Sequence, residues 1–256
     1  MKKEFINAQF EHSNNKFVTA LNYYKEHVHQ QYELLFILNG SGRFLIEDVE
    51  YTFSNNSMFL IPPGKYHLMT KLPEVDYDRI VLYFKPELFP KLLEKKLYFK
   101  KETTPSSRDL VVKYCDYLER LSDKVLSELI PCFITEILLT EFYGDTPLYN
   151  EQLSVPPLVK SAIEYINNNI DKPLTTKIIA DALFISHTHL GHAFSHVMNG
   201  GIMHYVQIKK IYKAQELLKQ GYTATTVAEM LGYKSYPTFI RNYKTYLSTT
   251  PSQDKK

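Results

Sequence analysis

The sequence has little cysteine and no long apolar segment. Cys115 and Cys132 are its two cysteines among 256 residues, and no metal-binding or redox motif surrounds either of them. Isolated cysteines argue against a disulfide scaffold and favour a reducing compartment. No run of about 18 apolar residues, the length that crosses a membrane, occurs, and residues 1–7 lack the apolar core of a signal peptide. We therefore expect a cytoplasmic protein that has no membrane partner.

The net charge is also small, but it is unevenly distributed. The formal charge of the whole chain is +2, with +6 on residues 154–256 and −4 on residues 1–153. A basic region beside an acidic one is typical of a nucleic-acid-binding module joined to a domain of another kind. The length allows two domains, each with its own hydrophobic core. We place the boundary near residue 150, so that the domains are 1–150 and 151–256.

The basic C-terminal region contains one pattern twice. A short helix, a tight turn and a second helix are predicted over residues 174–197 and again over 223–246. Ser186 and Ser235 precede the two second helices, where a serine hydroxyl can accept a hydrogen bond from a free backbone N–H. Apolar residues four and eight positions after each serine keep one face of the helix inward, and the opposite face can enter a DNA groove. A long helix over residues 202–220 joins the two copies.

Short strands alternate with turns in the N-terminal half. Runs rich in β-branched and aromatic residues are separated by turn signals such as Asn-Gly-Ser-Gly and Pro-Pro-Gly. The predicted strands cover residues 32–38, 43–47, 57–61 and 79–84. Many short strands with close turns favour a β-barrel of the jelly-roll kind. Two amphipathic helices are predicted over residues 107–121 and 123–143, which either pack on the barrel or also pair with a second chain.

Four potential metal ligands fall in two short motifs of the predicted barrel. The motifs are His-x-His-x3-Glu-x6-Gly and Pro-x-Gly-x2-His, and the ligand residues are His27, His29, Glu33 and His67. This spacing resembles the two motifs of the cupin family, and in enzymatic cupins the matching residues hold a divalent metal. Three imidazoles and a carboxylate are competent ligands for such an ion. Three interpretations stay open: polar residues at the mouth of the barrel, a metal site, or, together with Phe36, a pocket for an organic effector.

The signature near the C-terminus is more specific. Four segments stand in order: Ala214-x2-Leu217-Leu218, Val227-Ala-x2-Leu-Gly232-Tyr233, Phe239-x-Arg241-x-Tyr243-Lys244 and Thr250-Pro251. With the cupin-like half, they make nearly the whole chain resemble the AraC-type (arabinose-regulator) family of bacterial transcriptional regulators. The resemblance implies a two-domain α+β protein. It places a cupin-like β-barrel in residues 1–90, a helical dimerisation segment in residues 91–145, and an all-α double helix-turn-helix domain in residues 151–256.

The same resemblance implies a function. We expect a sequence-specific DNA-binding regulator rather than an enzyme, and an activator, since the family has more activators than repressors. The expected partners are double-stranded DNA, a second copy of the chain in a homodimer, RNA polymerase for an activator, and a small-molecule effector, with sugars as one class. No resident cofactor is expected. Two alternatives stay open: a metal-binding cupin enzyme or metal sensor fused to a DNA-binding module, and a regulator without a small effector, whose barrel is filled by large side chains.

The outward residues of both second helices are expected to contact DNA. Matched position by position to the family, they are His187, Thr188, Gly191, His192, Ser195 and His196 in the first unit, and Ser235, Tyr236, Thr238, Arg241, Asn242 and Lys244 in the second. Arg241 is the best candidate for reading a base, because arginine can bond guanine O6 and N7 together, whereas Lys244 suits a phosphate. The histidine-rich first helix has two alternatives, a solvated polar face and a metal-binding pair at His192 and His196.

Three residues depart from the family pattern. Lys210 replaces the usual arginine, which keeps the positive charge but loses the bidentate fork. Asn199 and Ser248 replace glycines, and asparagine is the next best residue for a left-handed backbone. Ser248 therefore makes the end of the second helix-turn-helix unit harder to place from the sequence.

Overall fold

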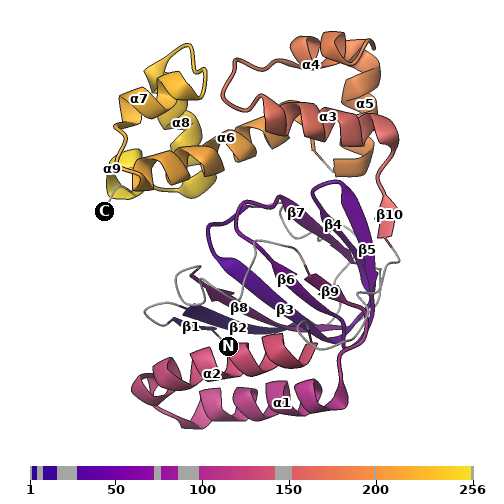
Figure 1. Cartoon of the computed structure of the whole chain (residues 1–256), viewed down its shortest axis with the longest axis vertical. Helices are drawn as coiled ribbons and strands as arrows, with labels where there is room; N and C mark the ends of the chain where they lie inside the picture. Colours follow the sequence, from indigo (N-terminus) through magenta and orange to yellow (C-terminus); the bar gives the residue numbers. More distant parts are fainter. Residues whose placement is uncertain are drawn as a thin grey trace.

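The computed structural model describes residues 2–4, 8–15, 28–71, 76–85, 98–141, 152–198 and 200–254. Its strands are β1 (Lys2–Glu4), β2 (Ala8–Asn15), β3 (Tyr32–Asn39), β4 (Gly42–Ile46), β5 (Val49–Phe53), β6 (Met58–Ile61), β7 (His67–Lys71), β8 (Tyr77–Phe84), β9 (Tyr98–Lys100) and β10 (Gln152–Ser154). Its helices are α1 (Pro105–Arg120), α2 (Asp123–Glu141), α3 (Pro157–Asn168), α4 (Thr176–Ala182), α5 (His187–Met198), α6 (Ile202–Lys219), α7 (Ala224–Met230), α8 (Tyr236–Leu247) and α9 (Pro251–Asp254). The strands lie between the α1–α2 pair and the C-terminal helices (Figure 1).

The strands form two antiparallel sheets that face each other, as a cupin-like barrel requires. The six-stranded sheet has the order β1-β2-β8-β3-β6-β9, and the four-stranded sheet has the order β10-β5-β4-β7. The predicted strands correspond to β3, β4, β6 and β8. Glu47, predicted at the end of a strand, instead lies in the turn between β4 and β5, with φ of 53°. Because β10 pairs with β5, residues 152–154 extend the barrel sheet just beyond the predicted domain boundary.

Strand β3 shows how one segment contributes to two hydrophobic cores. Side chains alternate between the two faces of a strand. Tyr32, Leu34 and Phe36 therefore lie on one face and pack with residues of α1 and α2. Leu35 and Ile37 lie on the other face, in the interior of the barrel. Both faces of β3 are buried, which is why its sequence reads as a nearly continuous apolar run.

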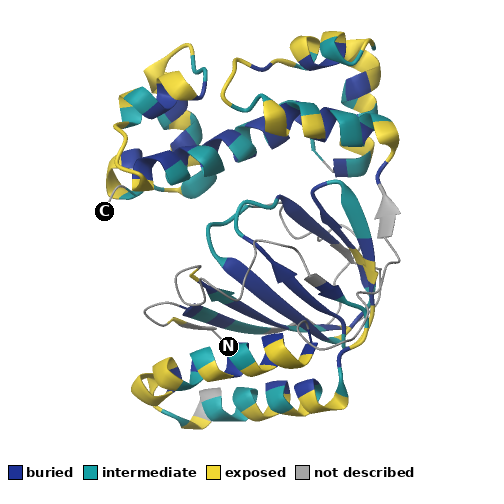
Figure 2. Cartoon of the chain, viewed as in Figure 1, coloured by how far each residue is buried: buried dark blue, intermediate teal, exposed yellow. Residues whose placement is uncertain are grey.

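Helices α1 and α2 cover the outer face of the six-stranded sheet, with their buried sides toward it (Figure 2). The start of α1 is tied to the end of α2. Thr104 caps α1 by accepting a hydrogen bond from the Ser107 N–H (3.3 Å), and its own N–H donates to Glu141 Oε1 (2.8 Å). Helix α1 begins two residues before its predicted range and ends one residue before the predicted end. Helix α2 agrees with its predicted range up to Glu141, and residues 142–143 lie outside the described residues.

The C-terminal half consists of two compact helical units joined by α6 (Figure 1). One core contains residues of α3, α4, α5 and the first half of α6, and the other contains residues of the second half of α6, α7 and α8. Gly221 follows α6 with φ of 96°, as expected for a residue that ends a helix. Both predicted helix-turn-helix units are present. None of the helices in the described ranges combines the length and the apolar character needed to span a bilayer.

Candidate DNA-binding surface and effector site

The second helix of each unit buries one face completely. Leu190 and Phe194 of α5, and Phe239 and Tyr243 of α8, have 0% of their surface exposed. These are the residues four and eight positions after each serine, as the sequence predicts. Because the inward face is fixed by packing, the outward face of each helix is presented to the surroundings in a defined orientation.

The ends of these helices agree with the predictions in part. Ser186 caps α5, since its Oγ accepts a hydrogen bond from the His189 N–H (3.2 Å). Ser235 occupies the matching position before α8 but makes no such bond with its side chain, so that part of the prediction is wrong. Ser248 ends α8 with φ of 54°, and its N–H donates to the Lys244 carbonyl (2.9 Å). The second unit therefore ends in the left-handed cap that glycine usually provides.

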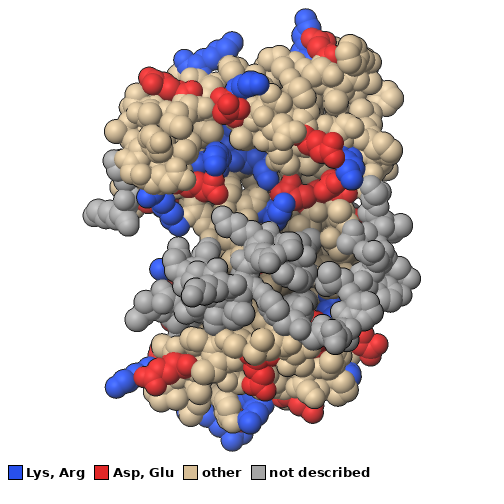
Figure 3. Space-filling model, in the orientation of Figure 1, with Lys and Arg blue, Asp and Glu red and all other residues tan. Residues whose placement is uncertain are grey.

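Most residues predicted to contact DNA lie on outward faces. Those that are exposed are His187, Thr188, His192, Ser195, His196, Ser235, Tyr236, Arg241 and Lys244, and those half-buried are Gly191, Thr238 and Asn242. The Asn242 amide donates to Gln207 Oε1 on α6 (2.7 Å), so it is already held by the protein. On the face shown in Figure 3, acidic and basic side chains are interspersed over the helical half. The DNA contacts of all these residues stay predictions.

A buried lysine bridges the two units. Lys210 lies on α6 with only 4% of its surface exposed. Its Nζ donates to the carbonyls of Lys172 (2.7 Å) and Leu231 (2.5 Å), which precede α4 and follow α7. Burial lowers the pKa of Lys210 to about 8. The position of a lysine within the apolar stripe of α6 is the sequence signal that could have revealed this role; the sequence identified it only as a departure from the family pattern.

The turn of the second unit packs directly on the segment before α4. Gly232 has φ of 66°, and a Cβ atom at this position would lie 2.6 Å from the backbone nitrogen of Pro173. A side chain therefore fits neither the backbone conformation nor the space. Together with Lys210, this contact fixes the orientation of one unit relative to the other.

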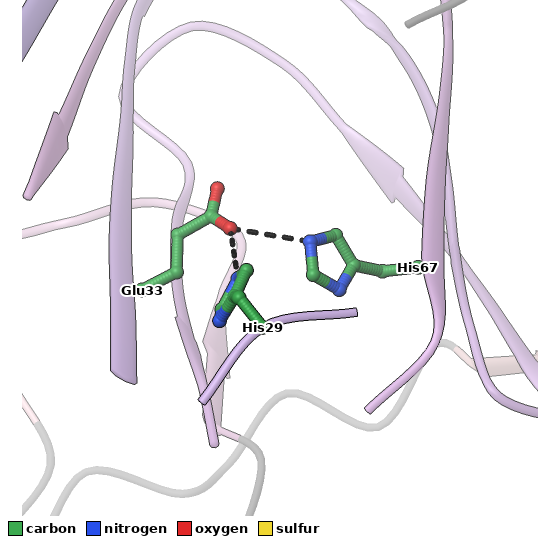
Figure 4. Close-up of side chains that lie close together, drawn as sticks. All are labelled: His29, Glu33 and His67. Carbon is green, nitrogen blue, oxygen red and sulfur yellow. Dashed lines mark hydrogen bonds and ion pairs between the residues drawn. The ribbon is translucent and has the colours of Figure 1, made fainter. Parts of the chain in front are cut away.

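Three of the four potential metal ligands converge inside the barrel (Figure 4). The Nε2 atoms of His29 and His67 lie 2.8 and 3.2 Å from Glu33 Oε2. Glu33 belongs to β3 of one sheet and His67 begins β7 of the other, so the group spans both sheets. Glu33 is 4% and His67 0% exposed. The fourth ligand, His27, lies outside the described residues. We call His29, Glu33 and His67 the polar cluster.

The backbone fixes the tautomer of both histidines in the polar cluster. Nδ1 of His29 donates to the Gln31 carbonyl (2.7 Å) and Nδ1 of His67 donates to the Lys65 carbonyl (2.8 Å), because a carbonyl can only accept. Each Nε2 faces the carboxylate, to which it can donate a hydrogen bond when it also carries a proton, or with which it can share a cation. Burial alone raises the pKa of Glu33, but its hydrogen bonds with the two histidines outweigh this effect and hold that pKa well below its usual range.

Phe36 does not belong to the polar cluster, and its role as an effector contact stays a prediction. Glu33 and Phe36 are three residues apart on β3 and therefore point to opposite sides of the sheet, and Phe36 packs against α1 and α2. The strand periodicity of two could have excluded it from the polar cluster. The aromatic rings beside the cluster are those of Tyr83 and Phe44, whose centroids lie 5.3 and 5.7 Å from the two histidine rings.

Comparison with known families agrees with both halves of the structure. The family described as AraC-like ligand binding domain matches residues 19–137, and a family described as Helix-turn-helix domain matches residues 179–256. The chain belongs to the AraC-type family of transcriptional regulators. It therefore combines a ligand-binding domain with a DNA-binding domain, and it is a regulator rather than an enzyme, as predicted.

Individual proteins are similar to this chain over all or part of its length. The HTH-type transcriptional regulator YfiF of Bacillus subtilis is 23% identical over 245 residues, which are 88% of this chain and 76% of YfiF. The multiple antibiotic resistance protein MarA of Salmonella typhimurium is 24% identical over 94 residues, 36% of this chain and 74% of MarA. Acireductone dioxygenase 1 of Physcomitrium patens is 32% identical over 87 residues, 32% of this chain and 44% of that enzyme. The crystal structure of ToxT from Vibrio cholerae aligns over 97% of both chains, with 15% identity and a TM-score of 0.40.

Proposed function

We propose that this AraC-type regulator reads DNA with α5 and α8 and binds its effector at the polar cluster. DNA reading is supported by the matching buried faces of α5 and α8, which belong to two helical units joined by the single helix α6. In double helix-turn-helix proteins such helices enter successive major grooves about 34 Å apart. Arg241 would read a base and Lys244 would hold a phosphate. Activation through RNA polymerase follows from the prevalence of activators in the family.

Selection of duplexes from a random pool by the purified full-length protein tests DNA reading. We expect one motif with two blocks about 10 base pairs apart and an affinity that falls steeply with salt. Replacing Arg241 with Ala should weaken binding by about 1–3 kcal/mol and relax the preference at one position. Replacing Lys244 with Ala should weaken binding to all sequences alike. A folded protein that enriches no sequence contradicts the proposal.

We infer a small polar effector from the chemistry of the polar cluster. A hydroxyl group can donate to the Glu33 carboxylate and accept from a histidine that carries its second proton, and the neighbouring rings of Tyr83 and Phe44 suit the flat face of a sugar. Binding stabilises the folded protein in proportion to ligand concentration. A thermal-shift screen of sugars should therefore raise the melting temperature of the wild type and not that of a Glu33→Gln protein. A ligand that shifts both equally binds elsewhere.

A metal sensor is the second candidate, and the tautomers of the two histidines favour it. Nδ1–H donation to a carbonyl orients the ligating nitrogen of many metal-bound histidines. One ligand atom from each of His29, Glu33 and His67 lies within 4.8 Å of the others, and two imidazoles with a carboxylate suit Zn²⁺ or a similar ion. We expect calorimetry to show one Zn²⁺ bound per chain, and His29→Gln to weaken it at least about tenfold. His12→Gln is the matched control, since His12 pairs with Asp78 outside the cluster.

A further inference from the structure

A buried ion pair joins the barrel to the helix that connects the two DNA-binding units. Glu47, in the β4–β5 turn, accepts hydrogen bonds from Lys209 Nζ (2.8 Å) and from the Tyr205 hydroxyl (2.8 Å), and both of these residues belong to α6. The side chains of Glu47 and Lys209 are only 9% and 14% exposed. Breaking a buried pair leaves an uncompensated charge. Removing one partner would therefore leave the other charge buried and unpaired.

The β6–β7 loop, residues 62–66, is part of the same interface. Lys209 Nζ also donates to the Gly64 carbonyl (3.1 Å), and the Tyr66 N–H donates to Glu47 Oε1 (2.9 Å). The ring of Tyr66 packs edge-on against Tyr205, with centroids 4.8 Å apart. The loop is thus held between the β4–β5 turn and α6 by polar and aromatic contacts together.

Glycine at position 64 is required by this packing. Its φ is 84°, and a Cβ atom would lie 2.7 Å from the ring of Tyr212 on α6. The backbone of the loop therefore lies against the Tyr212 side chain of α6. Figure 1 shows the ends of β4 and β7 facing α3 and α6, which is the side where these contacts occur.

The same loop also holds the polar cluster. The Gly64 N–H donates to the His29 carbonyl (3.0 Å), and the Lys65 carbonyl accepts from His67 Nδ1. His67 follows Tyr66 directly in the chain. A ligand that moves either histidine must therefore displace backbone atoms that position the partners of Glu47 and Lys209.

We propose that Glu47, Tyr205 and Lys209 form an interdomain latch that couples occupancy of the polar cluster to the position of the DNA-binding half. The proposal rests on the proposed function in one respect, that the cluster is the effector site. A ligand shifts the equilibrium between latched and released arrangements only as far as it binds one of them better. Because α6 carries both helix-turn-helix units, release of α6 changes the placement of both recognition helices relative to the barrel.

A double-mutant cycle on DNA affinity tests the latch. His29→Gln perturbs the cluster, and Glu47→Gln or Lys209→Met breaks the latch. We expect His29→Gln to change the Kd for the selected duplex at least about fivefold in the wild-type background and less than about twofold when the latch is broken. An equal change in both backgrounds overturns the proposal, and so does a His29→Gln protein with wild-type affinity. If His29→Gln fails to fold, Glu33→Gln replaces it.

Matched controls and a readout without DNA separate this proposal from the proposed function. Glu50→Gln on β5 and Lys213→Met on α6 remove similar charges that lie outside the interface, and they should leave the effect of His29→Gln unchanged. Hydrogen–deuterium exchange of residues 64–66 should become at least about fivefold faster in both latch variants and not in the controls. If no duplex binds, the proposed function fails while the exchange result still decides the latch; equal exchange in all variants overturns it.

Discussion

At the scale of single residues, four of the described residues other than glycine have a positive φ, and Phe184 and Ser248 are two of them. Phe184 in the turn of the first unit has φ of 57° and is 95% exposed, and Ser248 has φ of 54°. A left-handed backbone costs an ordinary residue about 1–2 kcal/mol. The Phe184 ring is almost entirely exposed, so little packing offsets this cost.

Replacing Phe184 with Gly should therefore stabilise the protein. Relief of the strain exceeds the entropic cost of glycine, about 0.5–1 kcal/mol, so the free energy of unfolding should rise by up to about 1 kcal/mol. Denaturant unfolding of the full-length protein measures it. Phe184→Ala, which removes the ring but keeps the Cβ atom, should give no gain; stabilisation by both variants would point to the ring rather than the backbone.

Lys210 should make stability depend on pH. Its pKa is about 8 in the folded protein, against an ordinary value of 10.5, because burial disfavours the charged form. Between these two values the unfolded chain binds a proton that the folded chain has lost, so the free energy of unfolding rises with pH. We expect the wild type to gain stability relative to Lys210→Met between pH 8 and 10.5, measured by urea unfolding at fixed pH values. A difference that stays constant over that interval contradicts the burial of this ammonium.

Residues whose roles depend on local spacing could be predicted from the sequence. The cap formed by Ser186 follows from its place before a helix, and the exposure of Arg241 follows from the helical period. The partners of Lys210 and the α6 partners of Glu47 could not be assigned in this way, because they lie more than 20 residues away in the chain. No periodic pattern and no motif in the sequence marks either of these contacts.

At the scale of elements, Gly232 should be essential for the packing of one helix-turn-helix unit on the other. Gly232→Ala adds strain at φ of 66° and a clash with the backbone of Pro173. We expect a loss of at least about 2 kcal/mol in the free energy of unfolding and weaker binding to two-block duplexes. Gly221→Ala is the matched control, since Gly221 also has positive φ but a Cβ there meets nothing within 4 Å. Equal losses in the two variants would show that the clash contributes nothing.

The strands that could be predicted are those with apolar or aromatic runs, because they are buried on both faces. β2 escaped prediction since residues 11–15 are polar, and it is a strand because it pairs with β8 over its whole length. β10 has three residues and exists only through its pairing with β5. Such elements are defined by a partner strand rather than by their own composition.

At the scale of the whole molecule, the outer surface of α1 and α2 is a candidate for self-association. Val112, Val125 and Leu139 are 61%, 43% and 51% exposed there, and exposed apolar patches often mark interfaces. We expect sedimentation to show a dimer that Leu139→Glu weakens. Tyr222→Glu, at a similarly exposed position after α6, is the control. A wild-type protein that stays monomeric at micromolar concentration contradicts the expected homodimer.

The division into two domains was visible in charge and motif, but the contact between the domains was not. That contact has a practical consequence for exchanging parts between regulators. A hybrid that joins the helical half of this chain to another sensor keeps Tyr205 and Lys209 and loses the carboxylate of Glu47. Its two halves would then lack the contacts of the interdomain latch. A functional chimera must therefore carry the β4–β5 turn and residues 62–66 together with α6. The turn and the loop lie more than 130 residues before their partners on α6 in the sequence.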